Sequence, residues 1–127
     1  MPWDIFGYRD NRNRNVIRKW LRTAGNVLAA KAEAKIRMLH QFGPDCPKGM
    51  LADTSDRHID KLRVLGNDNT RILVCKGPAN VGSEYTLLSA QAEKDRKLPK
   101  GAIEQAVARR AEVIADPANR REAHEFE

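Results

Sequence analysis

The sequence predicts an α+β fold in which an antiparallel β-sheet carries an N-terminal helix hairpin and a C-terminal helix. Apolar residues recur at helical spacing in two stretches near the N-terminus and in one near the C-terminus, whereas the middle of the chain alternates apolar and polar residues as half-buried strands do. The expected order is strand, helix, helix, strand, strand, strand, helix, with the helices on one face of the sheet. At 127 residues the chain has the length of a single domain, covering residues 1–127.

The N-terminal third predicts one strand and two helices. Residues 3–8 are rich in side chains that favour strands. A first amphipathic helix is expected over about residues 14–23, with Asn13 or Asn15 as its N-cap. A second helix follows after a short Gly-Asn link and ends at Gly43, because the next residue is a proline and cannot continue the helical hydrogen bonds. Such a short link predicts an antiparallel helix hairpin.

After the second helix, the helical spacing of apolar residues gives way to the alternation that is typical of strands. The stretch before them, residues 43–57, has no period and is expected to be a loop, long enough to suggest a functional or partner-facing segment. Strands are expected at residues 59–65, 70–76 and 84–90, a last helix at about 103–114, and a mobile, charged tail at 118–127.

Composition excludes several classes of protein. The chain has a net charge of +6, which fits either an ordinary solvated surface or a surface that binds nucleic acid. Aromatic residues make up only 6%, so a broad platform for stacking bases is not expected. The sequence has no apolar run of about 18 residues and no secretory signal pattern, and its two cysteines, Cys46 and Cys75, do not form a disulfide framework. We therefore expect a cytoplasmic protein with no membrane partner.

Metal and cofactor chemistry has no support in the sequence. His40, His58 and His124 are isolated from other residues with the spacing of metal ligands. The chain contains no glycine-rich dinucleotide or phosphate loop and no nucleophile elbow. No metal ligands and no cofactor are therefore predicted.

The first strand of the central hairpin separates charge from apolar surface. Because strand side chains alternate, Lys61 and Arg63 point to one face, while Leu62 and Val64 point to the other. This pattern fits a cationic binding face, and it fits an ordinary solvated face equally well.

Arg71, on the next strand, joins the cationic face only if the connecting loop has an odd length. A two-residue turn would place Arg71 on the apolar face, where an unpaired guanidinium is costly. A three-residue loop at 67–69 pairs Gly66 with Thr70 and places Arg71 beside Arg63. We therefore predict the odd-length loop.

Five segments of the chain each carry a short, distinct motif. In order they are Leu-His-Gln-Phe-Gly-Pro at 39–44, Asp-Lys-Leu-Arg-Val at 60–64, Thr-Arg-Ile-Leu-Val at 70–74, Leu-Leu followed by lysines and a proline at 87–99, and Ile-Glu-Gln-Ala at 103–106. Their order and spacing resemble the RelE/HigB superfamily of toxins from type II toxin–antitoxin systems, in particular its phage-derived HigB-like branch. The resemblance covers about residues 3–115.

This resemblance implies a RelE/ParE-like fold and a metal-independent endoribonuclease that cleaves messenger RNA on the ribosome and thereby inhibits translation. The implied partners are the ribosome, its messenger RNA and a cognate helix-turn-helix antitoxin. The residues that match the basic cleft of the family are Lys61, Arg63, Arg71, Lys94 and Lys97. Arg96 lies between Lys94 and Lys97 in the sequence.

The chemistry of RNA cleavage suggests a role for each of these residues. Without a metal, the 2′-hydroxyl attacks the neighbouring phosphate, and fixed cations stabilise the charge that develops. Arg71 is expected to clamp this phosphate through two oxygens, and Lys61 or Lys94 is expected to activate the hydroxyl. The residues expected to position RNA are Arg63, Arg96 and Lys97.

The chain also departs from the pattern of this branch. Ser-Ala-Gln at 89–91 stands where the branch has His-Gly-Phe, and the acidic Glu93 and Asp95 weaken phosphate attraction. His58 and His124 are the remaining candidates for a proton donor. The alternatives are a ParE-like toxin that inhibits DNA gyrase without cleaving RNA, a catalytically weakened binding protein with the toxin fold, or a basic RNA-binding module without toxicity.

Overall fold

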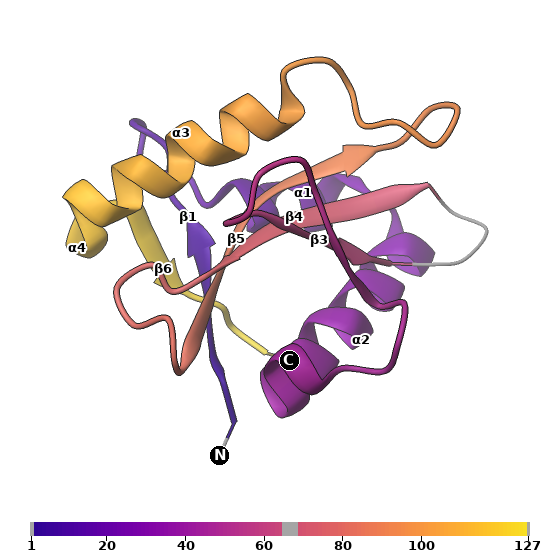
Figure 1. The fold of residues 1–127 in the computed structure, drawn as a ribbon, viewed down its shortest axis with the longest axis horizontal. Coiled ribbons are helices and arrows are strands. Elements are labelled where there is room, and N and C mark those ends of the chain that lie inside the picture. The colour runs from indigo at the N-terminus through magenta and orange to yellow at the C-terminus, as the bar shows by residue number, and fades with distance from the viewer. Residues whose placement is uncertain (1, 65–68, 127) are drawn as a thin grey trace.

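A computed structural model describes residues 2–64 and 69–126, which form one sheet flanked by helices (Figure 1). Its elements are β1 (Asp4–Tyr8), α1 (Val16–Thr23), α2 (Asn26–Phe42), the short 3₁₀ helix η1 (Gly43–Asp45), β2 (Leu51–Asp53), β3 (Asp60–Arg63), β4 (Thr70–Lys76), β5 (Glu84–Ala92), α3 (Ala102–Ala115), α4 (Pro117–Arg120) and β6 (Arg121–Ala123). Within the described ranges the strands lie in the order β2-β3-β4-β5-β1-β6.

The sheet is mixed, so the α+β class is confirmed and the antiparallel-only sheet is wrong. β1 runs parallel to β5, with Asp4 opposite Glu84 and Gly7 opposite Leu87. The pairs β2–β3, β3–β4, β4–β5 and β1–β6 are antiparallel. The period of a strand shows which side chains share a face, but it carries no information about the direction of a neighbour that is remote in the sequence.

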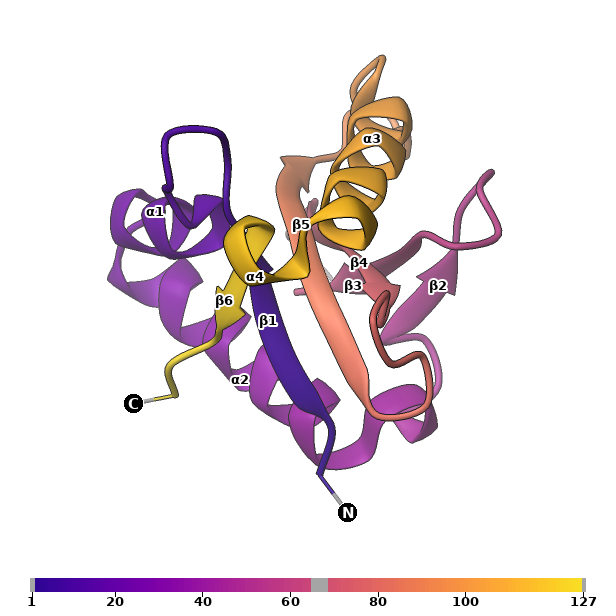
Figure 2. The same cartoon turned by 90° about the vertical axis from the view of Figure 1, so that its left-hand side faces the viewer.

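Helices cover both faces of the sheet, which corrects the prediction that they lie on one face. Figure 2 shows α1 and α2 on one side and α3 on the other. Ile72 and Val74 of β4 pack into the core beneath α1 and α2, whereas Leu73 and Cys75 pack into a second core beneath α3. All four side chains are fully buried. A continuous apolar run of this kind is typical of a strand that is covered on both sides.

The apolar spacing predicts both N-terminal helices, and the structure confirms them as α1 and α2. The Asn15 side chain caps α1 by accepting a hydrogen bond of 3.0 Å from the backbone N–H of Arg18. Along α2, the buried residues Ala32, Ile36 and Leu39 form a stripe that faces the sheet. No helix in the described part of the chain is long and apolar enough to span a membrane.

Two segments without a clear period in the sequence nevertheless form edge strands. Within the stretch expected to be a loop, β2 pairs with β3 through Leu51 and Leu62. Within the tail expected to be mobile, β6 pairs with β1, and Phe126 packs against the ring of His40 with centroids 4.7 Å apart. Each of these strands has three residues, which is too short for an alternating pattern to be recognised.

The pairing of β3 with β4 confirms that Arg71 shares the face of Lys61 and Arg63. Arg71 lies directly opposite Arg63, and the N–H of Val64 donates to the carbonyl of Thr70 at 3.3 Å. This register differs by two residues from the expected pairing of Thr70. The expected loop lies largely at residues 65–68, outside the described residues.

Gly43 ends α2 because its backbone and its surroundings exclude a side chain. Its φ is 55°, in the left-handed region that favours glycine, and a Cβ there would overlap the indole ring of Trp3. The backbone N–H of Trp3 donates a hydrogen bond of 2.7 Å to the backbone carbonyl of His40. The close approach of Trp3 to Gly43 therefore joins the start of β1 to the end of α2.

We expect Gly43→Ala to lower the free energy of unfolding by about 3 kcal/mol, because it combines backbone strain with a clash against Trp3. Gly25→Ala is the matched control, since Gly25 has a φ of 90° but no atom within 4 Å of the added Cβ. This control should cost only about 1 kcal/mol. Urea unfolding measures both changes, and equal losses would contradict the role given to Trp3.

Candidate functional site

Two of the predicted catalytic cations meet on one carboxylate at an end of the sheet. Lys61 Nζ donates to Glu93 Oε2 at 2.8 Å, and Arg71 Nη2 lies 3.2 Å from Glu93 Oε1. The Glu93 side chain is only 5% exposed, against 20% for Lys61 and 11% for Arg71. Both carboxylate oxygens are therefore engaged in a mostly buried ion-pair network.

The strand register explains why Glu93 reaches these cations. Gln91 lies opposite Arg71, and Glu93 follows it by two residues, so it falls on the same face. The N–H of Glu93 donates to the carbonyl of Asn69 at 2.8 Å, which fixes the chain just beyond β5. Gln91 itself donates through Nε2 to Oε1 of Gln105 on α3 at 3.4 Å.

The cations around Glu93 determine its protonation. Burial by itself would raise the pKa of Glu93, but the hydrogen bond from Lys61 and the positive charges of Arg71, Lys61 and Arg63 outweigh it and leave the pKa below its usual value. Glu93 is therefore a carboxylate at neutral pH. It offsets part of the positive charge that the sequence places on this face.

Arg63 adds an exposed cation to the same face. It lies directly opposite Arg71 on the neighbouring strand. Like charges in this position repel each other across a sheet, and an anion between them relieves the repulsion. Glu93 supplies one such anion through its ion pair with Arg71. The cluster of Lys61, Arg63, Arg71 and Glu93, hereafter the cationic cluster, thus holds three cations and one carboxylate.

The other predicted cations lie on a tight hairpin that begins directly after Glu93. Lys94 and Lys97 exchange backbone hydrogen bonds of 2.8 and 3.0 Å, while Asp95 and Arg96 between them have φ values of 53° and 63°. Two consecutive left-handed residues are typical of a type I′ turn. Lys94, Arg96 and Lys97 are all exposed. The structure therefore brings Lys61, Arg63 and Arg71 together and presents the other three cations to solvent beside them.

A pocket of about 310 Å³ adjoins the cationic cluster, and it contains two cations that sequence reasoning missed. Lys35 comes from α2 and Lys48 from the loop before β2, and they line the pocket together with Arg63 and Arg71. Lys35 lies on a helix, and the stretch around Lys48 was expected to be a loop, so no shared period connects either residue with the hairpin. Only the tertiary structure relates these four residues.

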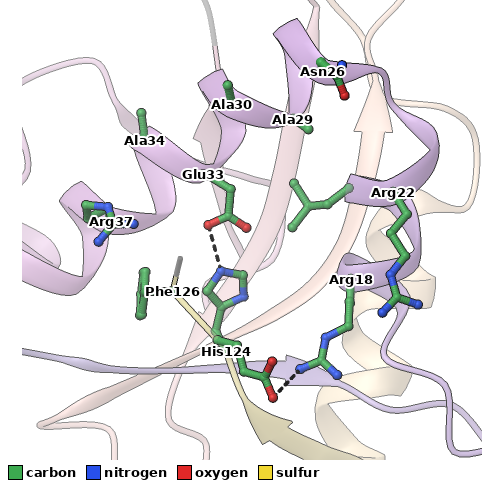
Figure 3. Close-up of a pocket in the computed structure, with 12 residues that line it drawn as sticks. Arg18, Arg22, Asn26, Ala29, Ala30, Glu33, Ala34, Arg37, His124 and Phe126 are labelled. Atoms are coloured by element: carbon green, nitrogen blue, oxygen red, sulfur yellow. Dashed lines mark hydrogen bonds and ion pairs between the residues drawn. The ribbon is translucent and has the colours of Figure 1, made fainter.

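A larger pocket lies elsewhere, between α1, α2 and the C-terminal segment (Figure 3). It has a volume of about 720 Å³ and an apolar wall that includes alanines of α2. Its acidic residues are paired, since His124 Nε2 lies 3.1 Å from Glu33 Oε2 and Arg18 lies 3.5 Å from Glu125. None of the six predicted site cations lines this pocket, but His124, a candidate proton donor, does.

The histidines do not join the cationic cluster. His124 contacts Glu33 and Phe126 at the large pocket, and the exposed His58 accepts from Arg57 Nε at 3.2 Å just before β3 begins. Among residues 2–64 and 69–126, no group of three or more His, Cys, Asp or Glu residues is arranged to hold a metal ion.

Comparisons with known proteins assign no family. No protein-family model matches the chain, and a search of curated proteins finds no match. Function is therefore inferred from the residues and their geometry.

The substitution Glu93→Gln removes the negative charge of the cationic cluster and preserves the size of the side chain. We expect the free energy of unfolding at neutral pH to fall by about 2 kcal/mol, because Lys61 and Arg71 lose a charged acceptor in a mostly buried site. A carboxyl whose pKa is lowered by folding stabilises the protein above its unfolded pKa, and this contribution is lost as the pH falls through the folded pKa. The difference between the two proteins therefore shrinks below about pH 4.

Urea unfolding at a series of pH values measures this effect. Glu125→Gln provides the control, because Glu125 pairs with Arg18 at 3.5 Å but is 81% exposed, so its loss costs less than about 0.5 kcal/mol. Equal losses in the two variants, or a loss in Glu93→Gln that is independent of pH, would contradict the role of Glu93 as counterion.

Proposed function

We propose that this protein is the toxin of a type II toxin–antitoxin system and acts as a metal-independent endoribonuclease on messenger RNA in the translating ribosome. The observation that carries this proposal is the convergence of Lys61, Arg63 and Arg71 at one end of the sheet, beside a pocket lined by further cations. The sequence resemblance to the RelE/HigB toxins supports the same function. The proposed partners are a helix-turn-helix antitoxin, the ribosome and its messenger RNA.

The arrangement of Arg71 and Lys61 suits a reaction in which the 2′-hydroxyl attacks the adjacent phosphate. The transition state gains negative charge on the phosphate oxygens, and cations that are already in place stabilise it without reorganisation. Glu93 holds both side chains in position through contacts of 2.8 and 3.2 Å. Arg71 is the better clamp for the phosphate, because a guanidinium donates to two oxygens at once.

The remaining roles are activation of the attacking hydroxyl and binding of the RNA. Lys61 or Lys94 activates the hydroxyl, and the lysine that does so reacts as a neutral amine, which takes the hydroxyl proton and becomes an ammonium, while the departing 5′-oxygen takes a proton from water. Arg63 and the exposed hairpin cations bind the RNA backbone and hold the phosphate in line for attack. The hairpin cations in this group are Lys94, Arg96 and Lys97.

A second candidate function is favoured by Glu93. Its carboxylate already neutralises part of the charge on Lys61 and Arg71, so a phosphate must compete with it for both side chains. This competition supports a toxin-fold protein that has lost cleavage and acts by binding, either as an inhibitor of DNA gyrase or through another protein partner. The two candidates differ in whether messenger RNA is cut.

Arg71→Lys tests the proposed clamp, because it keeps the positive charge beside Glu93 and removes the forked pair of donors. We expect cleavage of messenger RNA on programmed ribosomes to slow by about 100-fold, with little change in thermal stability. Mapping of RNA 5′ ends measures the rate. Arg12→Lys is the matched control, since Arg12 is exposed in the turn before α1, and its cleavage rate should equal that of the wild type.

The wild-type protein decides between the two candidate functions. If it leaves messenger RNA intact on programmed ribosomes, the nuclease proposal fails. Inhibition of DNA supercoiling by gyrase in a parallel assay would then support the second candidate. If Arg71→Lys cuts as fast as the wild type, Arg71 is not the clamp.

A further inference from the structure

The pocket beside the cationic cluster is assembled from separate parts of the chain. Lys35 lies on α2, Lys48 lies in the loop that leads to β2, and Arg63 and Arg71 lie on the paired strands β3 and β4. Residues far apart in the sequence thus bring four positive charges to the wall of one cavity of about 310 Å³.

The charges on this wall are unbalanced. Among the described residues that line the pocket, four are cationic and none is acidic, and Glu93 contacts Arg71 without lining the cavity. Lys48 and Arg63 are exposed, so both are accessible to a ligand. The large pocket at α2 differs, because its Glu33 and Glu125 pair with cationic partners. The smaller pocket therefore has the electrostatic character of a site for an anion.

The shape and the remaining wall indicate which anion fits. The exposed Pro47 gives the pocket an apolar part, with the buried Met50 and Val64 behind it; free phosphate does not need such a surface, but a sugar or base can contact it. The volume lies at the lower end of small-ligand pockets, about 300–1,000 Å³. Arginine and lysine together are typical of sites that bind the phosphate oxygens of a nucleic-acid backbone. One nucleotide unit satisfies both parts of the wall.

We propose that this pocket binds a backbone phosphate of single-stranded RNA, with Lys35 and Lys48 holding the phosphate next to the one clamped by Arg71. The pocket shares Arg63 and Arg71 with the cationic cluster, so a single strand can occupy both sites. The choice of RNA as the ligand rests on the proposed function. It adds a substrate-binding subsite that extends onto α2 and the loop before β2.

A binding experiment with an uncleavable ligand tests the subsite separately from catalysis. The probe is a fluorescent single-stranded RNA with 2′-O-methyl groups, which removes the attacking hydroxyl, and anisotropy is measured at several salt concentrations. We expect Lys35→Gln and Lys48→Gln each to weaken binding by about fivefold and to reduce the salt dependence by about 0.7 in slope, as for one lost phosphate contact. Lys19→Gln, on an exposed part of α1, should leave both quantities unchanged.

The outcomes separate this proposal from the nuclease proposal. If the Lys35→Gln/Lys48→Gln double variant is folded by thermal unfolding and binds with the affinity and salt slope of the wild type, the subsite does not exist. If an acidic peptide binds more tightly than the RNA and depends on the same two lysines, the pocket belongs to a protein partner and the RNA assignment is overturned. Lysine-dependent RNA binding by a wild type that cuts no messenger RNA would support the subsite and refute the nuclease.

Discussion

Two arginines that face each other across neighbouring strands impose the constraint on which this surface depends. Arg63 and Arg71 place like charges side by side, and such a pair is unfavourable in a sheet unless an anion lies close. The chain supplies its own anion in Glu93, whose carboxylate binds Arg71 and Lys61. The contacts of Glu93 with Arg71 and Lys61 keep the Glu93 carboxyl ionised and hold these two cations in place.

The two-sided core determines where these charges can lie. The middle of β4 is buried on both faces among apolar side chains, so a charged side chain has no place there. Arg71 stands next to this buried stretch, near the start of the strand, where its side chain is still 11% exposed. A shift of one residue in the β3–β4 pairing would bury Arg71 among apolar side chains, and the cost of that burial fixes the register.

The same interaction sets a balance between rigidity and available charge. Glu93 preorganises Lys61 and Arg71, but it also occupies their donors, so any anionic ligand of these two side chains has to compete with its carboxylate. The neighbouring pocket has no such internal anion among its described lining residues. In the proposed RNA complex, its lysines would therefore bind a phosphate without displacing an acidic residue of the pocket wall, whereas Lys61 and Arg71 would exchange contacts with Glu93.

The sequence alone determined what depends on near neighbours. The helical spacing predicted α1, α2 and α3. The two-residue period of β3 placed Lys61 and Arg63 on one face of the strand and Leu62 on the other, because side-chain direction follows from local backbone geometry. Only the tertiary structure decided the parallel β1–β5 pairing, the helices on both faces, Glu93 as the counterion, and the meeting of Lys35 and Lys48 with the strand arginines. These features join segments with no shared period, and they depend on how the whole chain buries its apolar surface on two faces of one sheet.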